Sequence, residues 1–218
     1  LMFAGEAYNV EMGISNQLFP QERDETPGCL FTPTPNDTLN LSTTPATGTS
    51  AGISNPAVVS DIEAFSNFMR MLAPPTPAPA TPATENGRAT FARIGCVHCH
   101  TPSFTTGAMI ASGSSTSPSA ALSHQTANLY SDLLVHHMGK GLADGITQGA
   151  AGPDEFRTAP LWGVGQRVFF LHDGRTTNLL DAIRDHKSPG SEANKVVEHF
   201  NKLHPREQQE ILDFLRSL

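Results

Sequence analysis

The pentapeptide Cys96-Val97-His98-Cys99-His100 constrains this chain more than any other stretch of its sequence. A Cys-x-x-Cys-His string is the attachment sequence of c-type haem: its two thiols bond to one porphyrin edge, and its histidine supplies an axial nitrogen to the iron. A structural zinc site would need further cysteines or histidines at matching spacing. The remaining cysteine, Cys29, stands far away in the sequence. We therefore expect one covalent haem c, bound through Cys96, Cys99 and His100.

The segment before this motif has the pattern of a helix that ends at it. Thr84 is a candidate N-cap, and Glu85 places an acidic side chain in the first turn. Gly87 and Phe91 are four residues apart and share one helix face. The arrangement resembles the first helix of the cytochrome c fold, in which a glycine lets the N-terminal and C-terminal helices cross closely. An ordinary amphipathic helix would not need glycine at this position.

Length and charge limit the classes of protein that the chain can belong to. Its 218 residues suffice for one large or two small domains. The formal net charge of −7 argues against nucleic-acid binding. No stretch approaches the ~20 apolar residues that cross a bilayer. Because haem is joined to this motif outside the bacterial cytoplasm, we expect a periplasmic or otherwise exported protein, of which this chain is a processed or truncated piece.

A short internal repeat suggests that two similar domains follow each other. Residues 63–72 match residues 209–218, and both segments have the apolar spacing of amphipathic helices. Between them, a Pro/Thr/Ala-rich run has the composition of a semi-rigid linker. The identical positions are Phe68 and Phe214, Arg70 and Arg216, and Leu72 and Leu218. The haem motif, however, occurs only once.

The repeat therefore predicts three segments and an all-α fold. Residues 1–72 would be the tail of a first cytochrome c-like domain whose haem motif is missing, mostly loop over residues 1–56. Residues 73–83 would be the Pro-rich linker, and residues 84–218 a complete c-type cytochrome domain with long loops. Within that domain, Tyr130–Met138 and Thr177–His186 are expected helices, and Ser103–Ser123 an exposed loop.

The second half of the chain resembles the bacterial di-haem cytochrome c peroxidases and, most closely, the di-haem oxidoreductases once labelled thiol oxidoreductases. These families have two cytochrome c domains with one haem each, which agrees with the repeat. The absent first motif is the one departure from this pattern. The matching stretches are Tyr130–Gly139, Gly141–Gly145, Phe156–Gly165, Leu171–Arg175 and Leu180–His186.

The second axial ligand of the iron decides between a catalytic haem and an electron relay. In the resembling families, the residue at the position of His186 is the distal ligand of the second haem. We therefore expect His186, with Met138 as the alternative, since Met138 stands near the expected haem face. Most methionines and histidines in a folded chain only pack or cap. The remaining candidates are His136, His137, His172 and His124.

Two further residues are candidates for contact with the porphyrin. Arg157 suits a haem propionate, because a guanidinium matches a carboxylate and keeps its charge when partly buried. A surface salt bridge is the plainer alternative. Trp162 is the only tryptophan, and it would either pack in the core or lie at the porphyrin edge.

These features predict a haem electron-transfer domain of a di-haem, peroxidase-like oxidoreductase. Its iron would be held by His100 and His186, and its partner would be a second haem domain or a redox protein. The alternative is a stand-alone mono-haem cytochrome c that carries electrons without catalysis. A haem that only stabilises the fold is the third option, and covalent haem with its own redox chemistry argues against it.

Overall fold

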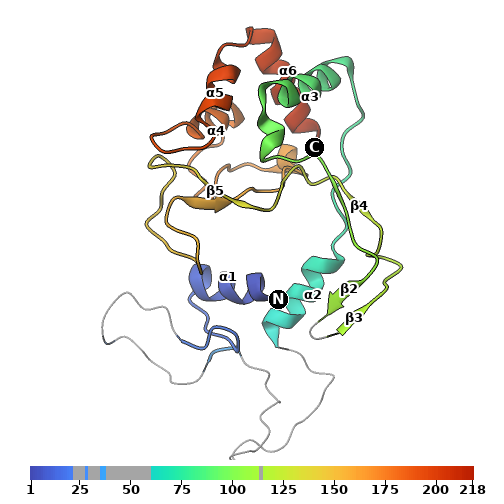
Figure 1. Ribbon diagram of the computed structural model, residues 1–218, viewed down its shortest axis with the longest axis vertical. Coiled ribbons are helices and arrows are strands. Elements are labelled where there is room, and N and C mark those ends of the chain that lie inside the picture. The colour runs from blue at the N-terminus through green and yellow to red at the C-terminus, as the bar shows by residue number, and fades with distance from the viewer. Residues whose placement is uncertain (22–27, 29–34, 38–59, 113–114) are drawn as a thin grey trace, which may run out of the picture. The chain divides into compact units, whose positions relative to one another are not determined.

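The computed structural model describes residues 1–21, 28, 35–37, 60–112 and 115–218 of the chain (Figure 1). The chain divides into two compact units, Leu1–Ala73 and Pro74–Leu218. Cys29 lies outside the described residues. Among the described residues, no helix combines the length and the apolar character needed to cross a membrane.

Within the residues that the structure describes, the first unit contains the helices α1 (Met2–Met12) and α2 (Asp61–Met71). Residues 1–56 were predicted to be mostly loop, and this prediction is wrong for Met2–Met12, which form α1. Tyr8 on α1 packs against Phe65 on α2, with ring centroids 5.6 Å apart. The Asp37 carboxylate accepts hydrogen bonds from the first two amides of α2, each at 3.0 Å, and so caps groups that a helix leaves unpaired.

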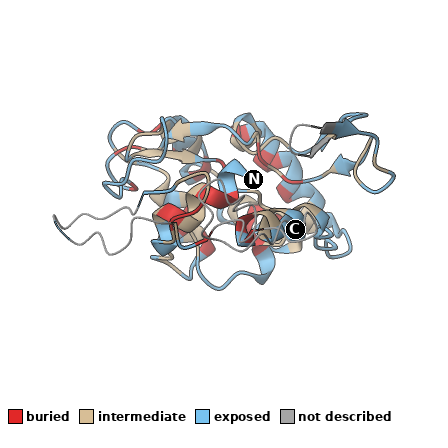
Figure 2. Cartoon of the chain, turned by 90° about the horizontal axis from the view of Figure 1, so that it is seen from below, coloured by how far each residue is buried: buried red, intermediate tan, exposed pale blue. Residues whose placement is uncertain are grey.

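The second unit is built around helices that enclose one apolar core. They are α3 (Pro82–Ile94), α4 (Leu179–Asp185), α5 (Asn194–Asn201) and α6 (Pro205–Ser217), with the 3₁₀ turns η1 (Cys96–His98) and η2 (Val164–Gln166). The buried side chains of this core come chiefly from α3 and α6, and Figure 2 colours buried positions red. They are Phe91, Ile94, Val164, Leu179, Phe200, Ile211, Leu212, Phe214 and Leu215.

Helices α3 and α6 cross in direct backbone contact. A Cβ at Gly87 would overlap the main-chain carbonyl of Glu210, so glycine is required at this position. The expected close crossing is therefore present. The helix begins earlier than predicted: Thr81 is the N-cap, and Thr84 is its partner in a capping box.

Small sheets correct the all-α prediction. The described strands form two-stranded antiparallel ribbons that pair β1 with β4, β2 with β3, and β5 with β6. Their bounds are Phe104–Thr105 (β1), Ile110–Ser112 (β2), Ser115–Ser117 (β3), Thr126–Ala127 (β4), Val135–His137 (β5) and Glu155–Arg157 (β6). The expected exposed loop at 103–123 thus contains strands.

The predicted helix at Tyr130–Met138 is wrong for a specific reason. Tyr130 and Leu133 have left-handed backbone conformations, with φ of 52° and 61°, which no continuous right-handed helix tolerates. The segment instead ends in β5, which pairs with β6. By contrast, the helix expected over 177–186 is confirmed as α4, with Asn178 as its N-cap and His186 as its C-cap residue.

Candidate haem site

The two motif cysteines lie at the turn η1, which comes directly after α3. Cys96 is the first residue of this turn, and Cys99 follows its last residue. Gly95 ends α3 with a φ of 105°, and η1 then begins at Cys96. Burial raises the pKa of Cys96 to about 12. Burial, and then the carboxylates of Asp132 and Glu192, raise the pKa of Cys99. Both thiols are therefore protonated near neutral pH.

The imidazole of His100 has the orientation and the protonation state of a metal ligand. Its Nδ1 lies 3.0 Å from the carbonyl oxygen of Tyr130, which can only accept, so Nδ1 carries the proton and Nε2 keeps its lone pair. Burial lowers the pKa of His100 to about 4, so the ring is neutral at physiological pH. Phe91 lies next to the ring, with centroids 6.1 Å apart. A neutral, oriented imidazole with a free Nε2 is what iron coordination needs.

His186 has the same arrangement on a different element. At the end of α4, its Nδ1 lies 2.7 Å from the carbonyl oxygen of Ala182, which again leaves Nε2 with the lone pair. Burial lowers the pKa of His186. His186 also contributes to the lowered pKa of His100, so the two rings lie within electrostatic reach of each other. Two such imidazoles, with two neutral thiols beside one of them, fit the requirements of a covalently bound haem.

Met138 lies beside the turn that follows His186. Its amide donates to Asp154 at 2.7 Å, and its carbonyl accepts a hydrogen bond from the Ser188 hydroxyl at 3.1 Å. Its side chain is half-buried. Met138, the alternative ligand, is therefore hydrogen-bonded to the turn that follows His186, the preferred ligand. The position of Met138 alone does not choose between the two.

The other candidate histidines have different surroundings. His137 is exposed and pairs with Asp154, at 3.2 Å. His172 stacks on Phe156, with centroids 4.3 Å apart. His124 is exposed and has a φ of 54°.

The two candidate porphyrin contacts differ in exposure. Arg157 is exposed on β6, where it pairs in register with Val135 of β5. Trp162 is half-buried, immediately before Gly163, whose amide donates to the carbonyl of Leu218 at 2.7 Å. Both positions stay predictions as haem contacts.

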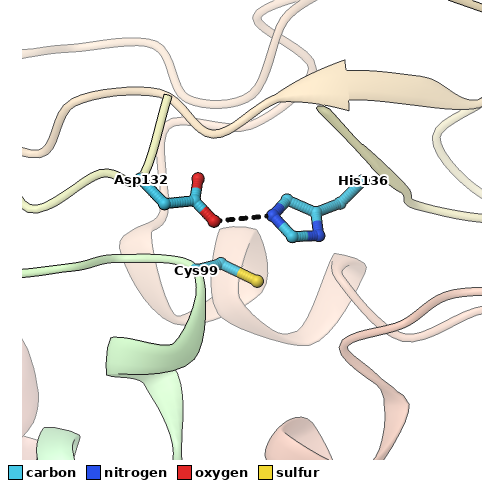
Figure 3. A group of neighbouring side chains, drawn as sticks. All are labelled: Cys99, Asp132 and His136. Atoms are coloured by element: carbon cyan, nitrogen blue, oxygen red, sulfur yellow. Dashed lines mark hydrogen bonds and ion pairs between the residues drawn. The ribbon is translucent and has the colours of Figure 1, made fainter. Parts of the chain in front are cut away.

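Cys99, Asp132 and His136 form a cluster whose ligand atoms all lie within 4.8 Å of one another (Figure 3). Such a trio can hold a metal ion, but both ring nitrogens of His136 already bond to carboxylates. Nε2 lies 2.9 Å from Asp132, and Nδ1 lies 2.8 Å from Glu192. Burial alone would lower the pKa of His136, yet these hydrogen bonds outweigh it and raise the pKa. Asp132, His136 and Glu192 therefore form a chain of ion pairs, and Cys99 lies beside it.

Sequence reasoning missed this chain of ion pairs. Asp132 lies in the matching stretch Tyr130–Gly139, but Glu192, 60 positions later, lies in none of these stretches, so spacing could not join them. The signal that was available was His136 itself, a histidine four residues after Asp132. The segment Tyr130–Met138 was predicted as a helix, and its residues Val135–His137 form a strand instead.

A family model matches almost the whole chain, and a solved structure has a partial likeness to it. No curated protein matches the chain. A solved structure of hydrazine synthase from Kuenenia stuttgartiensis is similar over 72% of this chain, with 19% identity and a TM-score of 0.46. The match covers 55% of the hydrazine synthase chain, so this chain spans about half of its length. The family model described as "Di-haem oxidoreductase, putative peroxidase" matches residues 4–218. The chain therefore belongs to the di-haem oxidoreductase family.

Proposed function

We propose that this chain carries one haem c, attached through Cys96 and Cys99, with His100 and His186 as the axial ligands of its iron. The observation that carries the proposal is the matched state of the two imidazoles. Each gives its Nδ1 hydrogen to a backbone carbonyl, and burial lowers the pKa of each. Both therefore present a neutral Nε2, and membership of a di-haem family supports the presence of haem.

The proposed role is electron relay within a di-haem oxidoreductase. When bound, the haem supplies one-electron redox chemistry at its iron. In this proposal His100 and His186 would both hold the iron, and so would leave no position at which a peroxide or other oxidant could bind it directly. The oxidant would then react at a second haem, and the segment around His100 and His186 would serve to fix the geometry of the relay.

The internal repeat supports placing residues 1–72 in the domain of that second haem. In α6, Phe214 and Leu215 are only 3% and 4% exposed, because α3 covers them. The matching residues of α2, Phe68 and Met69, are 60% and 49% exposed. An amphipathic helix with this much exposed apolar surface suits a position against another helix. We propose that its partner belongs to a second, exported haem domain.

Haem attachment can be tested by measuring the haem content of the protein and by replacing its cysteines. The purified protein should show one haem in a pyridine haemochrome assay, and acid acetone should not extract it. Cys96→Ser combined with Cys99→Ser should abolish covalent attachment, while Cys29→Ser should leave it unchanged as the matched control. Wild-type protein that releases its haem into acid acetone, or that contains none, would rule out the proposal.

A further inference from the structure

The segments that carry His100 and His186 are far apart in sequence. Residues 130–132 hold the segment of His100 in place. His100 bonds through Nδ1 to the Tyr130 carbonyl, at 3.0 Å. Two residues later, the amide of Asp132 donates to the carbonyl of Cys99 at 2.8 Å. The stretch 130–132 therefore holds both the ring of His100 and the backbone just before it.

The segment that carries His186 is held in a similar way. The hydroxyl of Ser191 donates to the carbonyl of His186 at 2.6 Å, and Ser191 is only 7% exposed. The next residue, Glu192, is bound to strand β5 through its backbone and its side chain. Its amide donates to the carbonyl of His137 at 2.9 Å, and its Oε1 accepts from the amide of His137 at 3.0 Å.

His136 joins these two segments. It lies on β5, with Nε2 2.9 Å from Oδ2 of Asp132 and Nδ1 2.8 Å from Oε2 of Glu192. Carboxylates only accept, so both ring nitrogens must carry hydrogens, and the ring is an imidazolium. A chain of hydrogen bonds therefore runs from the segment of His100 through His136 to the segment of His186.

The burial of the chain separates it from an ordinary surface salt bridge. The side chain of His136 is 17% exposed and that of Asp132 is 11% exposed, whereas Glu192 is 48% exposed. Exposed pairs contribute little, because water competes for both charges. Charge-assisted hydrogen bonds that are partly shielded are stronger and hold a defined geometry.

We propose that His136 is a positioning residue that fixes the separation of His100 and His186 by clamping Asp132 to Glu192. This inference rests on the proposed function for the roles of the two ligands. With the clamp intact, the segments that carry the two rings would be held at a fixed separation. Without it, the segment of His186 stays bound to β5 through His137, but the link from Glu192 to Asp132 is lost, and the bond of His186 to the iron would weaken.

The experiment measures how readily the distal ligand leaves the iron. Cyanide binding to the ferric protein requires displacement of that ligand. His136→Leu removes both hydrogen bonds and should raise the apparent cyanide affinity roughly tenfold or more, which corresponds to about 1.4 kcal/mol. His136→Arg should restore most of the wild-type behaviour, because a guanidinium donates to two carboxylates at once.

The neighbouring histidine provides the matched control. His137 lies on the same strand, is exposed and also pairs with a carboxylate, but its side chain does not join the two ligand segments. His137→Leu should leave cyanide affinity within roughly twofold of the wild type. If His136→Leu does not fold, Glu192→Gln is the deciding variant, because it keeps the shape and removes one charge of the clamp.

The outcomes separate this inference from the proposed function. If the wild type has the low-spin signature of two imidazole ligands, but His136→Leu or Glu192→Gln binds cyanide no better than His137→Leu, the positioning role is overturned. If the wild type lacks that low-spin signature, the ligand assignment itself fails. An increase that His136→Arg reverses supports the clamp, because a general loss of packing would not respond to a restored charge.

Discussion

Gly87 on α3 and Glu210 on α6 lie in backbone contact, so that a side chain at residue 87 would overlap the Glu210 carbonyl. This crossing also supports the haem site. Phe91, one turn after Gly87, packs against Phe214 with ring centroids 5.5 Å apart, and it lies 6.1 Å from the ring of His100. The contact between two helix backbones therefore sets the position of an aromatic side chain next to the imidazole of His100.

Gly87→Ala should destabilise the second unit. Alanine favours a helix by up to ~1 kcal/mol over glycine, but the added methyl group meets a backbone carbonyl that cannot rotate away. Overpacking of this kind costs about 1–3 kcal/mol, so the free energy of unfolding should fall. Urea denaturation measures it. Gly107→Ala is the control, because a Cβ there meets nothing closer than 3.6 Å; an equal loss in both variants would contradict the close crossing.

The internal repeat offers a matched pair of substitutions. Phe214→Ala should lower the free energy of unfolding by about 3–5 kcal/mol, since it removes a buried ring from the core. Phe214 is 3% exposed, whereas its repeat partner Phe68 is 60% exposed. In this chain, Phe68→Ala should change the stability by less than ~0.5 kcal/mol. A large cost at Phe68, measured by the same denaturation, would mean that the described chain already buries this face.

The sequence predicted best where the chemistry is local. Spacings of a few residues define the haem motif, the helix before it, the glycine of the crossing and α4. The structure contains the helix as α3, the close crossing at Gly87, and α4. The segment at Tyr130–Met138 was mispredicted because its apolar residues fit a helical period as well as an extended one. Pairing of β5 with β6 and the left-handed backbone at Tyr130 decide its conformation, and a single sequence does not reveal either.

The network around His136 was beyond prediction for a similar reason. It depends on Glu192, which follows α4 and meets β5 only after the chain has folded back. The same holds for the state of the two proposed ligands. Burial makes His100 neutral, and the Tyr130 carbonyl fixes its proton on Nδ1, whereas the sequence supplies only its position after Cys99.

The ion pair of Asp173 and Arg175 should make the stability of the second unit depend on pH in the acid range. The hydrogen bond with Arg175 lowers the pKa of Asp173 to about 2, against an ordinary value of 3.8. A lowered pKa means that the stabilisation is fully present above pH 3.8 and is lost as the pH falls through about 2. Arg175 also donates to the carbonyl of Gly141 at 2.6 Å, so the pair holds a second loop.

Arg175→Gln should remove this acid-range contribution. The difference in free energy of unfolding between wild type and variant, followed by urea denaturation from pH 6 to pH 2, should narrow as the pH falls, and the share that comes from the lost bond to Gly141 should remain. Asp173→Asn is the control, because it removes the titrating group and should show the same reduced dependence on pH. A difference between wild type and Arg175→Gln that stays constant down to pH 2 would contradict the pairing.

The choice between His186 and Met138 as distal ligand can be made spectroscopically. His186 has a neutral Nε2 and a fixed ring, and Met138 lies beside the turn that follows it. His186→Ala should convert the ferric iron from low spin to high spin, because it removes one axial bond. Added imidazole should restore the low-spin spectrum, since it can occupy the space left by the side chain. Met138→Leu, which nearly conserves volume, should leave the spectrum unchanged. If Met138→Leu alone changes the spin state, or if the wild-type protein has a sulfur-to-iron charge-transfer band, Met138 is the ligand and the matched chemistry of the two imidazoles has another cause.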